Sequence, residues 1–251
     1  MNDPLLFLLA GLFLPLFPLS MVFNALLVGL PSRWLRALLI LVWPQWGVLW
    51  VRSLEGVTPD WIPVLAVFTA ALYALRLPAM RDVIRWLGLL ATSLWALLWL
   101  AVEHPRLGAE HLHLYTLWFS LPLVGVALIT GSLESRFGAA YAGLNMALAS
   151  SLPRLSGVWV LPILAATATP LFPGFFVMIN LLAAAKPAKA IAVMVIWLLW
   201  SWAAARLIQG MIVGTRAPDV VTDLRRDTTW IYAMAMTGLV SAGLYWTRVP
   251  V

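Results

Sequence analysis

The sequence contains no cysteine and little charge. Only 10% of its 251 residues are Asp, Glu, Lys or Arg, whereas 63% are hydrophobic; a soluble domain carries roughly 25% charged residues. The absence of cysteine excludes disulfide bonds and thiolate metal sites. A chain this apolar could not hide its side chains from water, so we interpret it as an integral membrane protein.

The hydrophobic runs are continuous and long enough to cross a bilayer as helices. A membrane β-barrel would instead alternate polar and apolar residues in segments of about ten, and in lipid the backbone must be bonded internally. We therefore predict one transmembrane domain over residues 1–251: an all-α polytopic bundle of about eight helices, one of them broken. The predicted spans are 4–30, 35–52, 60–77, 83–102, 112–133, 155–171, 173–213 (interrupted) and 229–247.

Acidic residues are missing from the span centres. All ten Asp and Glu fall in loops or at span ends, and residues 155–185 contain no ionisable group. Paired charges inside the bilayer, which mark proton or cation paths, are therefore absent from those spans. The net charge of +6 comes from basic residues scattered singly in short loops. That pattern suits membrane orientation, and we predict no nucleic-acid partner.

The basic residues divide unequally between the two sides of the membrane. With the N-terminus outside, eleven lie on the cytoplasmic side: Arg33, Arg36, Arg76, Arg81, Arg85, Arg136, Arg154, Arg206, Arg216, Arg225 and Arg226. Three lie outside, and Lys186 and Lys189 raise that number to five at most. The positive-inside rule then predicts a bacterial cytoplasmic (inner) membrane protein with both termini on the periplasmic side.

Prolines interrupt the second half of the chain. Pro170, Pro173 and the adjacent Gly174 predict a helix break, because proline removes a hydrogen bond and clashes with the preceding turn. Pro187 lies between two lysines and predicts a second hinge. If residues 175–213 form one interrupted helix, Lys186 and Lys189 lie near mid-bilayer, where lysine marks a functional site. If 175–185 is a hairpin arm, both reach the outer surface.

A small polar cluster precedes the fifth span. Glu110, His111 and His113 lie close together in the sequence, but residues two apart project to different faces of a helix. We expect an interfacial polar cap rather than a metal site. With no phosphate-binding loop and no serine elbow, we predict no metal, no cofactor and no catalytic residue.

Residues 130–176 resemble a known family. Gly131, Arg136, Gly138, Leu144, Pro153, Pro170, Pro173, Gly174 and Phe175 match, in order and spacing, the proton-translocating antiporter-like subunits. Respiratory complex I, Mrp-type cation/proton antiporters, membrane-bound hydrogenases and carbon-uptake complexes share these subunits. Ala74–Trp86 and Ala204–Leu207 extend the likeness to about 62–213, leaving the two spans in 1–60 unassigned. The resemblance implies one five-helix repeat with a half-channel around a broken helix, followed by a final span over 229–247.

Three positions depart from the family pattern. The family has a histidine and then a lysine in the helix before the linker, and these positions carry over to Phe119 and Leu123. A lysine or glutamate four residues after the glycine carries over to Met178. Apolar side chains cannot bind a proton. The resemblance therefore implies a truncated, degenerate accessory subunit beside a full-length proton-conducting partner.

Two alternatives remain open. In the first, the chain conducts ions along a rearranged path through Lys186, Lys189, His111, His113 and Glu103. In the second, it is a membrane enzyme with its site at the histidine cluster, and bound zinc lost in a His111/His113 variant would support it.

Overall fold

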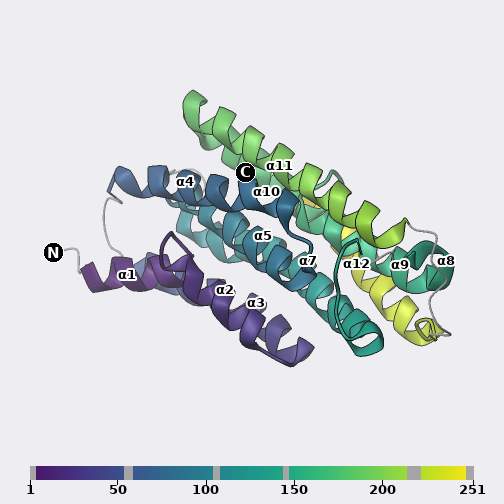
Figure 1. Cartoon of the computed structure of the whole chain (residues 1–251). Coiled ribbons are helices and arrows are strands. Elements are labelled where there is room, and N and C mark those ends of the chain that lie inside the picture. Colours follow the sequence, from purple (N-terminus) through teal and green to yellow (C-terminus); the bar gives the residue numbers. More distant parts are fainter. Residues whose placement is uncertain (1–3, 54–58, 104–107, 144–146, 214–221, 247–251) are drawn as a thin grey trace.

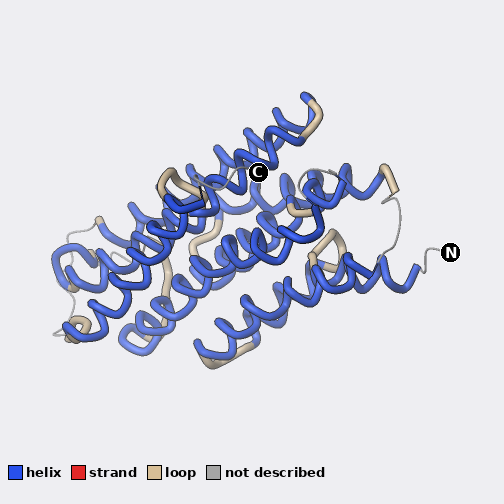
Figure 2. The backbone as a smooth tube through the Cα atoms, turned by 180° about the vertical axis from the view of Figure 1, so that it is seen from behind, coloured by secondary structure: helices blue, strands red, loops and turns tan. Residues whose placement is uncertain are grey.

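The computed structural model describes residues 4–53, 59–103, 108–143, 147–213 and 222–246, without the side chains of 4, 5, 103, 108–110 and 246. These residues form an elongated bundle of helices and no strand (Figures 1 and 2). The predicted all-α class is confirmed. The helices are α1 (Pro4–Phe13), α2 (Ser20–Gly29), α3 (Arg33–Ser53), α4 (Trp61–Arg76), η1 (Leu77–Ala79), α5 (Val83–Leu97), α6 (Trp99–Glu103), α7 (Gly108–Phe137), α8 (Leu148–Ser151), α9 (Pro153–Ala166), α10 (Pro173–Ala184), α11 (Pro187–Ile212) and α12 (Arg226–Trp246).

Five helical segments are long and apolar enough to cross a membrane. They are residues 33–53, 61–79, 83–102, 111–137 and 187–212. The segment 83–102, formed by α5 and α6, is buried on nearly every side, and Trp86 and Trp95 are fully enclosed. A helix that is apolar all round belongs in an interior. It lies at the centre of the bundle, against α2, α4 and α7.

Two further crossings consist of paired short helices. α1 and α2 are separated by residues 14–19, and α9 and α10 by residues 167–172. α11 then runs antiparallel to α10, because Phe175 and Trp197, on either side of the 185–186 turn, have ring centroids 5.6 Å apart. The five long segments, the two broken pairs and α12 give eight helical units among the described residues, and five of these units meet the length and hydropathy of a membrane span.

Two span boundaries were predicted wrongly. The span 4–30 is not continuous: Pro15 and Pro18 lie in its middle, and proline cannot donate a helix hydrogen bond. The span 173–213 is not one interrupted crossing: the chain reverses at residues 185–186, and α11 is a separate helix. The broken crossing is instead α9 with α10.

One end of the bundle gathers the loops that were predicted to be cytoplasmic. Arg36 Nη1 lies 2.7 Å from Glu134 Oε2, which ties α3 to α7. Asp223 accepts hydrogen bonds from Arg154 N at 3.0 Å and Leu155 N at 3.1 Å, so its carboxylate satisfies free N–H groups at the start of α9. We call this end, which also carries Arg76, Arg85 and Arg136, the arginine end.

Candidate functional site

The break between α9 and α10 is the candidate functional site. α9 ends at Ala166 and α10 begins at Pro173, with Gly174 next. Between them the backbone turns through left-handed conformations at Ala168 (φ 55°) and Leu171 (φ 84°). Such conformations are costly for residues other than glycine. Proline at 170 and 173 supplies no N–H that could continue the helix.

Neighbouring side chains satisfy the exposed backbone of this break. Thr167 Oγ1 donates to the Ile163 carbonyl at 3.1 Å, and Thr169 Oγ1 donates to the Leu164 carbonyl at 2.9 Å. The indole N–H of Trp197, from α11, donates to the Thr167 carbonyl at 3.0 Å. Within a membrane, irregular backbone is tolerated where protein covers it or where it lines a wet cavity. Here protein covers Thr167, Ala168 and Phe172, whereas Pro170 and Leu171 are exposed, and the donors are hydroxyl and indole groups.

Two helices pack closely on the same break. A methyl group added at Gly174 would lie 3.5 Å from the Phe119 ring of α7. A methyl group added at Gly243 of α12 would lie 2.7 Å from the Leu171 carbonyl oxygen and 3.0 Å from the Pro173 nitrogen. α12 therefore approaches the break through a residue that has no side chain.

The three positions at which the chain departs from the family pattern are buried, and two of them lie beside this break. Phe119 is 1% exposed, and Leu123 and Met178 are 0% exposed. Phe119 lies against Gly174, and Met178 lies one turn further along α10. All three side chains are apolar, and none of them can bind a proton.

Replacing Gly243 with alanine is expected to destabilise the protein by about 1–3 kcal/mol, because the methyl group overpacks rigid backbone. Gly238 is the matched control on the same helix, since a methyl group there meets nothing within 4 Å. Gly238→Ala is expected to be neutral or to stabilise by up to about 1 kcal/mol through helix propensity. The folded fraction after heating in mild detergent, read by size-exclusion chromatography, compares the two variants. Equal behaviour would contradict the close approach of α12.

A second break, between α1 and α2, was missed by the sequence analysis. Trp43 Nε1 donates to the Leu12 carbonyl at 3.2 Å, and Trp99 Nε1 donates to the Leu14 carbonyl at 3.0 Å. The Phe17 N–H donates to Thr69 Oγ1 at 3.0 Å. Indole and hydroxyl groups satisfy this break too, and among the described side chains no ionisable group takes part. Pro15 and Pro18 were the sequence signal for it.

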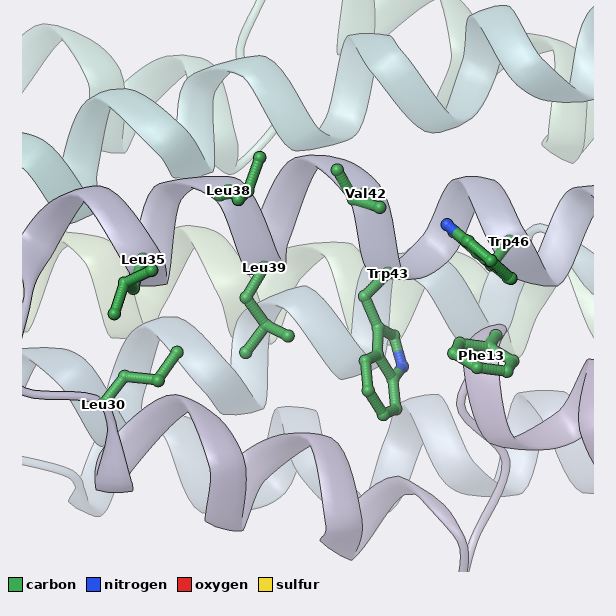
Figure 3. Close-up of a pocket in the computed structure, with 8 residues that line it drawn as sticks. All are labelled: Phe13, Leu30, Leu35, Leu38, Leu39, Val42, Trp43 and Trp46. Atoms are coloured by element: carbon green, nitrogen blue, oxygen red, sulfur yellow. The ribbon is translucent and has the colours of Figure 1, made fainter.

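An apolar groove adjoins the break between α1 and α2. It has a volume of about 460 Å³ and lies beside Phe13 and α3. Figure 3 shows Trp43 and Trp46 projecting from α3, with Phe13 near the rings. The remaining lining residues are leucines and Val42. This groove offers contacts to hydrocarbon and no group that could bind or transfer a proton.

Solved structures share this fold. A chain of respiratory complex I from Thermus thermophilus has a TM-score of 0.81 and 21% identity over 95% of this chain and 54% of that chain. A chain of the membrane-bound sulfane sulfur reductase, an archaeal respiratory membrane complex, has a TM-score of 0.81 and 15% identity over 95% and 51%. A chain of the Mrp complex from Dietzia sp. has a TM-score of 0.69 and 15% identity over 95% and 55%.

The chain has the fold of a membrane subunit of these complexes. The fold implied by the resemblance to antiporter-like subunits is thereby confirmed, and the chain is a multi-pass membrane protein. The antiporter-like fold covers 95% of the chain, which is more than the residues 62–213 that carry the sequence resemblance. The chain spans about half the length of the chains that it matches. No protein-family model and no curated protein matches the sequence.

Within this antiporter-like fold, the two lysines lie at a turn. Lys186 is exposed and immediately precedes α11, Pro187 is the first residue of α11, and Lys189 is half-buried in its first turn. This arrangement matches the hairpin alternative, because both lysines sit at one end of a helix that is 26 residues long. They lie at the opposite end of α11 from the arginine end.

The histidines point in different directions. His113 Nδ1 lies 2.7 Å from Gln45 Oε1 of α3. His111 is exposed, with its ring 6.3 Å from that of Tyr115, whose hydroxyl accepts a hydrogen bond from Asn180 of α10 at 3.2 Å. The side chain of Glu103 lies outside the described residues. Among the side chains that are described, no three His, Asp or Glu residues cluster as metal ligands.

Proposed function

We propose that this chain is an accessory membrane subunit of a proton- or cation-translocating complex. One observation carries the proposal: Phe119 and Met178 are buried beside a broken helix and Leu123 is buried in α7, at positions where the resemblance implies ionisable residues. A lysine on a proton path works because desolvation and neighbouring charges can shift its pKa. None of these three side chains can take a proton.

The break suits a structural role. Threonine hydroxyl groups and the Trp197 indole satisfy its backbone carbonyls, whereas membrane carriers place ions at broken helices that offer free backbone groups. The chain would support a full-length antiporter-like subunit, and would border or close that neighbour's own path. The runs Ala183–Ala185 and Ala203–Ala205 would permit close helix approach.

The proposed partners are other membrane subunits, among them a full-length antiporter-like protein. The expected location is a bacterial cytoplasmic membrane with both termini periplasmic. That orientation rests on the excess of arginines at the arginine end. No cofactor or catalytic step is assigned to the chain itself.

Purification from native membranes in a gentle detergent, followed by mass spectrometry, tests the proposal. The chain should co-purify with other membrane subunits, including a longer antiporter-like chain. Mixing tagged and untagged cells before solubilisation controls for association formed after extraction. A lone monomer under conditions that keep other respiratory complexes intact would contradict the proposal.

The alternative function is conduction by the chain itself. It gains support from the hydrogen bond between Asn180 of α10 and Tyr115 of α7, because His111 lies at the start of α7 and α10 leads through the turn at residues 185–186 to Lys189 of α11. A Lys186→Ala/Lys189→Ala variant distinguishes the two functions. If ions pass through these lysines, the variant should lose ion transport while the complex still assembles. If the chain is an accessory subunit, ion transport should be unchanged.

A further inference from the structure

A groove with a basic mouth lies between α2 and the α4–α5 connection. It has a volume of about 490 Å³, and Asn24, Arg76 and Arg85 line it together with apolar residues of α2 and α5. Arg76 is the last residue of α4, and Arg85 is the third residue of α5. The 3₁₀ turn η1 and the start of α5 therefore bring two guanidinium groups to one groove at the arginine end.

The charge at the mouth is positive on balance. Arg85 Nε lies 3.7 Å from Asp82 Oδ2. The other carboxylate oxygen of Asp82 already accepts hydrogen bonds from the N–H groups of Ile84 and Arg85 at 2.9 and 3.1 Å. Among the described residues, no carboxylate pairs with Arg76. Both arginine side chains are exposed and can turn toward an anion.

The groove combines its basic mouth with an apolar wall. Asn24 is held in place because its side-chain amide donates to the Ser20 carbonyl at 3.0 Å and to Thr92 Oγ1 at 2.9 Å. Ala25 and Val28, which follow Asn24 toward the arginine end of α2, form an apolar wall with Leu89 of α5. An amphipathic occupant with a negative head and a hydrocarbon tail complements both parts of this groove.

We infer that the groove binds one anionic phospholipid. The phosphate would accept hydrogen bonds from Arg76 and Arg85, since guanidinium groups bind phosphate in bidentate, charge-assisted pairs. One acyl chain would lie along Val28 and Leu89. Basic pockets between transmembrane helices on the cytoplasmic side are suited to anionic lipid headgroups. This inference does not depend on whether the chain conducts protons.

Native mass spectrometry of the purified protein with added phosphatidylglycerol or phosphatidylcholine tests the inference. The wild type should retain one phosphatidylglycerol in preference to phosphatidylcholine. An Arg76→Gln/Arg85→Gln variant should weaken phosphatidylglycerol binding by about ten-fold or more. Arg225→Gln/Arg226→Gln is the matched control, because it removes the same charge from exposed residues outside the groove, and it should bind as the wild type does.

A substitution in the apolar wall tests whether the acyl chain of the lipid also binds the groove, or only its phosphate. Val28 is 42% exposed, so Val28→Trp should fold and fill the groove, and it should weaken phosphatidylglycerol binding. Equal binding of the two lipids would overturn the inference. Unchanged binding in the double glutamine variant, or in Val28→Trp, would overturn it as well.

Discussion

Replacing Met178 with lysine is expected to prevent most of the protein from accumulating in folded form. Met178 is 0% exposed and lies in α10, one turn after the break against which Phe119 packs. A buried ammonium loses its hydration, and in this setting no described carboxylate compensates it. The expected loss of stability is about 3–5 kcal/mol. Membrane yield and heat resistance in detergent measure it.

Met178→Leu is the matched control, because it conserves volume and should cost less than about 1.5 kcal/mol. The family pattern makes the lysine variant informative, since it places a lysine or glutamate at this position. If Met178→Lys were as stable as the wild type, the break would have to hold water or a compensating charge, and the account of a dry site would be wrong.

Replacing Arg36 with alanine is the second substitution from which we expect a large effect. Arg36 Nη1 binds Glu134 at 2.7 Å, and its Nε donates to the Leu30 carbonyl at 2.7 Å. The Arg36 side chain is only 9% exposed, whereas Glu134 is 28% exposed. Removing the Arg36 side chain leaves the Glu134 carboxylate and the Leu30 carbonyl without their hydrogen-bond donor. The expected cost is about 2–3 kcal/mol, measured as a lower midpoint of thermal unfolding in detergent.

Two further variants show how much of that loss of stability comes from the buried ion pair. Arg36→Ala/Glu134→Gln removes the orphaned charge and should recover part of the stability, although the Leu30 carbonyl stays unpaired. Arg225→Ala breaks an ion pair of 3.9 Å whose side chains are 87% and 84% exposed, and exposed pairs contribute little. If Arg36→Ala behaved like Arg225→Ala, the contact between α3 and α7 would not depend on the buried pair.

The sequence was sufficient to predict the fold class, because long apolar runs permit only helices in lipid. It predicted the break at Pro170–Gly174 but not the break between α1 and α2. Pro15 and Pro18 resemble the prolines at 170 and 173, but the apolar run 4–30 around them is long enough to read as one span. The prolines at 170 and 173 were recognised as a break. The sequence nevertheless joined residues 173–185 to the helix that follows Lys186, whereas in the structure they continue the crossing begun by α9.

The site could be predicted only in part. Counting residues from Gly131 and Gly174 led to Phe119, Leu123 and Met178, because related chains keep the order of their motif residues and the number of residues between them. It could not identify Trp197, Trp43 or Gly243, since their roles arise from packing between helices far apart in the sequence. An indole N–H that caps a distant carbonyl has no local pattern.

The central claim is that no proton passes through this chain, and flux in proteoliposomes tests it most directly. The purified chain is reconstituted with a pH-sensitive dye inside, and a pH gradient and a membrane potential are imposed. We expect the pH inside these proteoliposomes to change at the same rate as in protein-free liposomes until a protonophore is added. A protein-dependent proton flux that the Lys186→Ala/Lys189→Ala variant abolishes would contradict the account and establish conduction through those lysines.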